Sequence, residues 1–198
     1  MQLGYKEKFY FDVSGRNDWA SSLYGTGNDS YFYPSVGMTS ILSNILKMPD
    51  FVSFGKLRAS YTIVGNEVPF NKVEQNNVIT TSGVEYNTTK PFTNLKPEMI
   101  HSMEFGGDWR FFNGLYGVDF TIYNIKSKDQ FISLPAPSGS GYTNYFVNAG
   151  KVVNSGVELS INLTPIKHAN FSWFNSLNFS VNKNKIVKLH PDLKDVLS

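Results

Sequence analysis

Apolar and polar residues alternate along most of this 198-residue chain, and no other feature restricts its fold as strongly. A period of two residues is typical of a β-strand with one apolar and one polar face, whereas the period of a helix is almost absent. The alternation predicts seven strands, at residues 5–16, 31–42, 54–65, 98–112, 115–127, 146–164 and 170–187. We therefore predict an all-β fold.

The charged residues in the central parts of these strands all fall on the polar face of their strand. Seven of them come from the third to the sixth predicted strands: Lys56, Arg58, Glu104, Asp108, Arg110, Asp119 and Glu158. This separation is typical of a membrane barrel with an apolar outside and a charged, water-filled lumen. A soluble β-sandwich also buries one face of each strand, so the separation alone does not distinguish the two architectures.

The predicted connections differ in length in a regular way. They are residues 17–30, 43–53, 66–97, 113–114, 128–145 and 165–169. Long connections alternate with shorter ones, which is expected of an antiparallel up-and-down meander that crosses a bilayer, with turns on one side and extended loops on the other. A compact soluble domain seldom contains a structureless loop of about thirty residues, unless the loop has a function.

Aromatic residues gather near the short connections. They make up 15% of the chain, while charged residues make up only 17%, below the usual value of about 25%. Six of the aromatic residues lie at predicted strand ends on the short-connection side: Trp109, Phe111, Phe112, Tyr116, Phe171 and Trp173. An aromatic girdle at a membrane interface would have this distribution. The alternative is that these rings close the end of a soluble core.

Basic residues are scattered along the chain rather than gathered in a run, and the net charge is +2. A nucleic-acid-binding protein usually carries a basic stripe, and an anionic membrane surface usually binds a basic patch. We predict neither of these features, and nucleic acid is not an expected partner.

The residues that would hold a metal or cofactor are also missing. The chain has no cysteine, so a disulfide, a cysteine-ligated zinc and a thiol nucleophile are excluded. His101, His168 and His190 lie far apart, with no second histidine or carboxylate at ligand spacing. We predict no metal site and no cofactor. No apolar stretch is long enough for a transmembrane helix, and the segment after Met1 lacks the features of a signal peptide.

Two carboxylates are candidates for catalysis. Asp108 and Asp119 are predicted to face the same side of adjacent strands, where a pair of carboxylates could act as acid and base. A charged lumen explains the same placement more economically. We therefore predict that the chain is not an enzyme.

Five aromatic residues in the predicted outer loops are candidates for binding: Trp19, Tyr24, Tyr86, Tyr142 and Tyr145. Aromatic rings in loops can stack on sugar faces or contact a lid protein. The alternative is that each ring stabilises its own loop.

Several blocks of the sequence resemble one family of membrane proteins. They include "YFYPSVGMTSIL", "KLRASYTIVGNE", "NLKPEMIHSMEFGGDWRFFNG" and "NAGKVVNSGVELSINLTPIK". In order and spacing they are similar to the SusC/RagA family of TonB-dependent outer-membrane transporters of Bacteroidota. Within that family, "LKPE" (95–98) precedes a strand with "EFG" (104–106), and "YN" (123–124) precedes "NAGKVVNSGVEL" (148–159). The resemblance covers nearly the whole chain.

The resemblance implies a 22-stranded transmembrane barrel in the cell outer membrane, surrounded by lipid and filled by a plug. It implies import of glycans or peptides beneath a SusD-like lipoprotein lid, powered through the TonB complex. No plug domain, TonB box or signal peptide has a counterpart here, so residues 1–198 are expected to be a fragment of the barrel domain.

One alternative from another class stays open. A soluble or surface-attached all-β carbohydrate-binding module would also explain the alternation and the loop aromatics, and a glycan hydrolase is a more distant possibility. An opposing sheet that covers Phe105, Val118 and Leu159 would favour the module and exclude the barrel.

Overall fold

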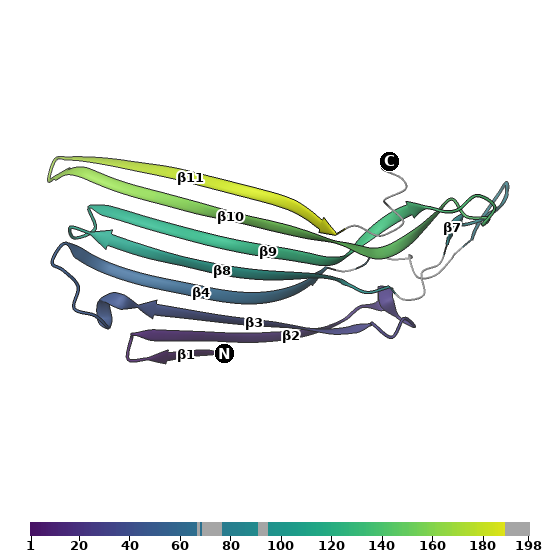
Figure 1. Cartoon of the computed structure of the whole chain (residues 1–198), viewed down its shortest axis with the longest axis horizontal. Coiled ribbons are helices and arrows are strands. Elements are labelled where there is room, and N and C mark those ends of the chain that lie inside the picture. The colour runs from purple at the N-terminus through teal and green to yellow at the C-terminus, as the bar shows by residue number, and fades with distance from the viewer. Residues whose placement is uncertain (67, 69–76, 91–94, 189–198) are drawn as a thin grey trace.

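One curved antiparallel sheet makes up most of the molecule (Figure 1). The computed structural model describes residues 1–66, 68, 77–90 and 95–188. The eight strands on the main path of the sheet are β1 (Gln2–Tyr5), β2 (Phe9–Trp19), β3 (Ser30–Ile41), β4 (Val52–Asn66), β8 (Glu98–Phe111), β9 (Tyr116–Pro135), β10 (Asn144–His168) and β11 (Phe171–Lys188). Each of them pairs with the next along the chain. This order confirms the predicted up-and-down meander.

The shorter elements lie outside the main path of the sheet. Strands β5 (Val78–Thr80) and β6 (Gly83–Glu85) form a separate hairpin, and β7 (Thr89–Lys90) pairs in parallel with the start of β10. Two 3-10 turns, η1 (Ser21–Leu23) and η2 (Leu42–Asn44), follow β2 and β3. In the part of the chain that the structure describes, no helix is both long and apolar enough to cross a membrane.

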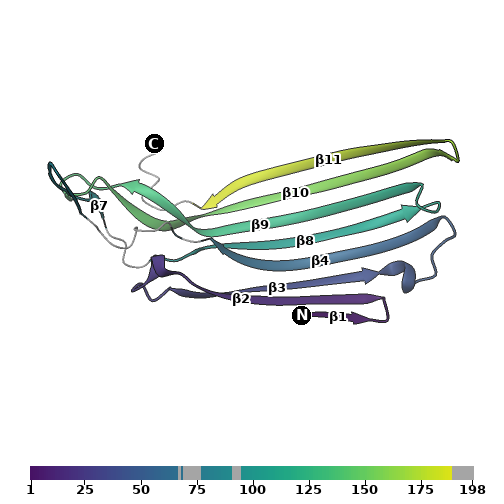
Figure 2. The same ribbon diagram turned by 180° about the vertical axis from the view of Figure 1, so that it is seen from behind.

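The connections separate into two ends of the sheet. Residues 6–8, 42–51, 112–115 and 169–170 join strands at one end, and residues 20–29, 67–97 and 136–143 join them at the other. We call these the short-connection end and the loop end. They lie at opposite ends of the strands in both views (Figures 1 and 2). The predicted alternation of long and short connections holds only in part, because residues 42–51 at the short-connection end form a longer connection than residues 136–143 at the loop end.

Several predicted strand boundaries differ from the structure. The predicted first strand, residues 5–16, is divided by a turn at residues 6–8, so that Leu3 on β1 pairs with Phe11 on β2. Lys6 and Glu7 adopt φ values of 50° and 53° in this turn. Such values are uncommon outside glycine, asparagine and aspartate, so the sequence gives no signal of the turn.

Strands β9 and β10 also extend further than predicted, into residues 128–145. Their pairing continues to Pro135 and Asn144, past a position where Asp129 (φ 56°) lies opposite Gly150 (φ 82°). These two left-handed residues interrupt the regular alternation. The interruption hides the continuation of both strands from sequence-based reasoning.

The register of the sheet gives it one apolar and one polar face. A single row of paired residues crosses all eight strands of the main path: Leu3, Phe11, Met38, Ala59, Phe105, Ile122, Val157 and Val181. Every member of this row is apolar. The seven charged residues predicted for the polar face all fall in rows of the opposite parity.

No second layer of described residues covers the apolar face (Figures 1 and 2). Phe105 is 45% exposed, and Val118 and Leu159 are only half-buried. The small hydrophobic core lies instead at the loop end, where Ala20, Leu23, Val68 and Leu95 pack together with Tyr31 and Phe131. An apolar sheet face of this extent needs an apolar environment to be stable.

Candidate functional site on the polar face and in the loops

An arginine lies across three strands at the centre of the polar face. Arg58 on β4 is paired with Gly106 on β8, which is paired with Thr121 on β9. The guanidinium Nη1 and Nη2 donate to the two carboxylate oxygens of Asp119 at 3.0 and 2.9 Å, and Nη2 also donates to Thr121 Oγ1 at 2.7 Å. This is the bidentate geometry in which arginine binds a carboxylate most strongly.

The two glycines of the "EFGG" motif leave space on opposite faces of β8. A Cβ at Gly106 would lie 2.9 Å from Arg58 Nε and 2.7 Å from the backbone oxygen of Phe120. A Cβ at Gly107 would lie 2.7 Å from the Phe120 ring and 3.0 Å from Leu57 on the apolar face. Gly106 therefore lets Arg58 reach β9, and Gly107 lets Phe120 lie flat on the apolar side.

The second carboxylate of the polar face is also matched by cations. Asp108 is directly paired with Asp119 across β8 and β9. Its Oδ2 lies 3.7 Å from Lys56 Nζ and 3.5 Å from Arg110 Nη2. Because both carboxylates contact cations, the group resembles an ion-pair network more than a catalytic acid and base.

The other two of the seven predicted charges are more open. Glu104 is exposed and accepts a hydrogen bond from Ser102 Oγ at 3.2 Å. Glu158 is exposed in the same row as Arg58 and Thr121. The structure thus places all seven predicted charges on one face. Their position in a lumen remains a prediction.

Two of the family-like motifs meet at the loop end. The side chain of Asn148, from "NAGK", binds the backbone of Lys96, from "LKPE". Lys96 N donates to Asn148 Oδ1, and Asn148 Nδ2 donates to Lys96 O, both at 2.7 Å. Asn148 Nδ2 also donates to Asp129 O at 2.9 Å. Together with buried Leu95, this clasp holds the long β4–β8 connection against β9 and β10.

The five predicted binding aromatics fall into two groups. Tyr86 and Tyr142 come from adjoining segments, because Thr143 N donates to Thr88 O at 2.8 Å and Tyr145 pairs with Lys90. Trp19 and Tyr24 belong to the β2–β3 connection and its end, and they are 74% and 79% exposed. Trp19 and Tyr145 lie in strand ends rather than in loops, because β2 and β10 extend further than predicted.

No group of three or more histidine, cysteine, aspartate or glutamate residues suited to a metal occurs among the described residues.

A family model described as "TonB dependent receptor-like, beta-barrel" matches residues 1–191. The chain belongs to this TonB-dependent receptor family. Two curated relatives agree with the match. TonB-dependent receptor P3 from Formosa agariphila is 32% identical over 97% of this chain and 20% of its own length. TonB-dependent receptor SusC from Bacteroides thetaiotaomicron is 29% identical over 92% of this chain and 20% of its own length.

Solved structures give the same result. The RagAB peptide importer in its closed-closed state has a TM-score of 0.83 and 27% identity, over 95% of this chain and 21% of that chain. The siderophore receptor PirA from Pseudomonas aeruginosa, with a TM-score of 0.60 and 16% identity, shares the fold. The resemblance to the SusC/RagA family and the barrel-type fold are confirmed. This TonB-dependent receptor chain spans about a fifth of the length of its curated relatives.

Aromatic rings of this TonB-dependent receptor segment pack together at the short-connection end. Proteins of this type lie in the outer membrane. At the short-connection end, Phe51 packs against Phe111 and Phe112, with ring centroids 6.3 and 6.2 Å apart, and Phe112 meets Tyr116 edge-on at 5.7 Å. The predicted gathering of rings at this end is confirmed. Such a group is typical of the aromatic girdle where a barrel meets the membrane interface.

Proposed function

We propose that residues 1–198 form part of the barrel wall of a TonB-dependent outer-membrane importer. In this arrangement the apolar face contacts lipid and the polar face lines the lumen. The apolar row that crosses eight strands on an uncovered face is the observation that supports the proposal most directly. Further barrel strands would pair with the outer edges of β1 and β11, because unsatisfied backbone groups in lipid cost several kcal/mol each.

The ion-pair network makes this part of the wall rigid. Arg58 joins β4 to β9 across β8, and Lys56 and Arg110 hold the neighbouring Asp108. A network of this kind holds the charges of the polar face in fixed positions. The wall would then serve as a stable conduit, while a plug moved by TonB would open and close it.

We also propose that the loop end faces the cell exterior, beneath a SusD-like lipoprotein, and contacts a glycan or peptide substrate. The exposed rings of Trp19, Tyr24 and Tyr86 support this proposal. A relative of known structure, RagAB, is described as a peptide importer, and peptides and glycans both offer surfaces on which aromatic rings can stack. Uptake assays with Trp19→Ala and Tyr24→Ala would test the role of these rings.

Spin labels on alternate residues of β8 test the orientation of the wall. In the intact barrel that contains this segment, cysteines introduced at Met103, Glu104, Phe105 and Asp108 would each carry one label. We expect labels at 103 and 105 to collide mainly with oxygen, which dissolves in lipid. Labels at 104 and 108 should collide mainly with a water-soluble nickel chelate. Equal chelate accessibility at all four positions would contradict the proposal.

A further inference from the structure

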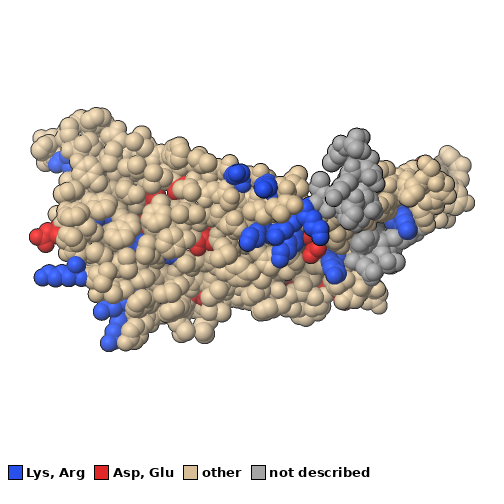
Figure 3. Space-filling model, viewed as in Figure 1, with Lys and Arg blue, Asp and Glu red and all other residues tan. Residues whose placement is uncertain are grey.

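Six lysines gather on the apolar face where its apolar part ends, beside the end of β11 and part-way along β9 and β10. They are Lys126, Lys128, Lys151, Lys183, Lys185 and Lys188. We call this group the lysine belt. In Figure 3, blue atoms gather beside a broad uncharged surface at this place. The sequence alone predicted no basic patch, because these residues are spread from 126 to 188 and only the register of three strands brings them together.

The register places like charges side by side. Lys151 on β10 pairs with Lys128 on β9 and, across a β-bulge, with Lys188 on β11, so three lysines lie side by side. Lysines directly opposite each other destabilise a sheet. None of the ion pairs between described residues includes a lysine of the belt. Asp129, which follows Lys128, is the acidic residue nearest to the row in sequence. An external anion would relieve the repulsion within this row.

The belt lies at the height of lipid headgroups if the apolar face meets lipid. On β9, Tyr116 belongs to the aromatic group at the short-connection end, and Lys126 lies ten residues further along. At about 3.4 Å per residue and a tilt of about 40°, this distance is roughly 26 Å along the membrane normal. The apolar band of an outer-membrane barrel is about 25 Å tall. Polar groups begin at the same level on β4 and β8, where Tyr61 Oη lies 2.8 Å from His101 Nδ1.

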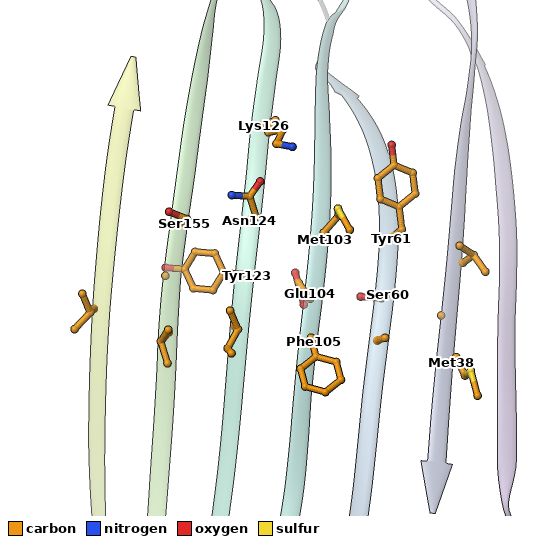
Figure 4. Close-up of a pocket in the computed structure, with 17 residues that line it drawn as sticks. Met38, Ser60, Tyr61, Met103, Glu104, Phe105, Tyr123, Asn124, Lys126 and Ser155 are labelled. Atoms are coloured by element: carbon orange, nitrogen blue, oxygen red, sulfur yellow. The ribbon is translucent and has the colours of Figure 1, made fainter. Parts of the chain in front are cut away.

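A groove on the apolar face leads to this belt (Figure 4). Its volume is about 1080 Å³, and its lining includes Met38, Ala59, Tyr61, Phe105, Ile122 and Val157. Asn124 and Lys126 line its end toward the loops, as Figure 4 shows. An apolar groove that ends in a lysine matches a molecule with a hydrocarbon chain and an anionic head.

We propose that the belt and the groove bind a phosphate-bearing lipid of the membrane leaflet on the loop side. The lipid phosphate contacts the lysine row, and one acyl chain lies along the groove. The ammonium groups act as point charges on flexible stems, which suits a headgroup with several phosphate positions. The bound phosphate also offsets the repulsion between Lys128, Lys151 and Lys188. This inference rests on the proposed orientation of the apolar face toward lipid.

Titration of the delipidated intact barrel with phosphatidylglycerol, followed by native mass spectrometry, tests the site. The variant carries Lys128→Gln, Lys151→Gln and Lys188→Gln together. We expect its affinity for phosphatidylglycerol to fall on the order of a hundredfold, with binding of phosphatidylcholine of the same chain length unchanged. Replacing the same three lysines by arginine should preserve most of the affinity, because the charge is kept.

A matched control uses three lysines of the short-connection end. Lys6→Gln, Lys8→Gln and Lys47→Gln remove the same charge, and this variant should bind phosphatidylglycerol like the unchanged barrel. Equal loss in both variants, or no loss in the first, would overturn the proposal. Displacement of the lipid by inorganic phosphate at similar concentration would also overturn it, because the site would then bind free anions. If the spin labels confirm the orientation of the two faces but the belt variant still binds phosphatidylglycerol normally, the lipid-site proposal is wrong and the barrel-wall proposal stands.

Discussion

Two clusters of charge in this sheet differ in how they are neutralised. On the polar face, Arg58 binds Asp119 through two hydrogen bonds, and Lys56 and Arg110 lie beside Asp108. On the apolar face, the lysine belt has no ion-pair partner among the described residues. In the proposed orientation, the protein therefore supplies its own counter-charges on the lumen face. Where the wall meets a membrane surface, the membrane can supply them.

The largest effect is expected from a charge placed inside the apolar band. Phe120 lies on the apolar face of β9, two residues before Ile122 of the continuous apolar row. Phe120→Arg in the intact barrel should lower the free energy of unfolding by about 2–4 kcal/mol, because the guanidinium must enter hydrocarbon. Reversible unfolding in lipid vesicles would measure the loss.

A matched variant places the same charge on the other face. Ser160 lies opposite Asp119 in a polar row. Ser160→Arg should cost far less than Phe120→Arg, because the new cation lies in the lumen near two carboxylates. Similar losses from the two variants would show that the faces are assigned incorrectly.

A smaller loss of stability is expected from filling the space above Gly106 through which Arg58 reaches β9. A Cβ at Gly106 would lie 2.7 Å from the Phe120 backbone oxygen and 2.9 Å from Arg58 Nε. Gly106→Ala should therefore cost about 1–3 kcal/mol in unfolding free energy, because the backbone cannot yield as easily as a side chain. Gly117→Ala is the control, since the nearest heavy atom to its Cβ would be Asn162 Cβ, at 3.7 Å. That change should be neutral or slightly stabilising. A loss in Gly117→Ala as large as in Gly106→Ala would contradict the expectation.

The faces of the sheet could be predicted from the sequence, whereas most of the contacts between strands could not. Alternation assigns Arg58 and Asp119 to one face because the side-chain period of a strand does not depend on its neighbours. Which residues lie opposite each other depends on register, which alternation leaves open. The Arg58–Asp119 pair, the space above Gly106 and the row of three lysines all follow from register.

Some strand boundaries also cannot be predicted from alternation, because they depend on the backbone angles of single residues. Lys6, Glu7 and Asp129 adopt left-handed backbone angles that these residue types only sometimes take. The role of Asn148 was also hidden, because its partner Lys96 is distant in sequence. Asparagine carries both a donor and an acceptor, and Asn148 lies in a motif whose spacing matches the family. These two features are the only signal of the clasp that the sequence contains.

The smallest expected changes in stability have opposite signs in the two charge clusters. Lys151 is paired with both Lys128 and Lys188, so Lys151→Gln removes two unfavourable contacts. In neutral detergent this variant should be more stable to unfolding by about 0.2–1 kcal/mol. Arg58→Gln should change stability in the opposite direction, with a loss of about 1 kcal/mol, because Arg58 and Asp119 are both more than a third exposed.

Addition of phosphatidylglycerol should reverse the gain in Lys151→Gln, because the unchanged barrel would then be stabilised by the bound lipid and the variant less so. The loss in Arg58→Gln should not depend on the lipid, since its partner Asp119 lies on the other face. Denaturant unfolding of both variants, with and without the anionic lipid, would measure these four values. If Lys151→Gln destabilises the barrel in neutral detergent, the lysine row is balanced by a group of the protein itself, and the contrast between the two clusters is wrong.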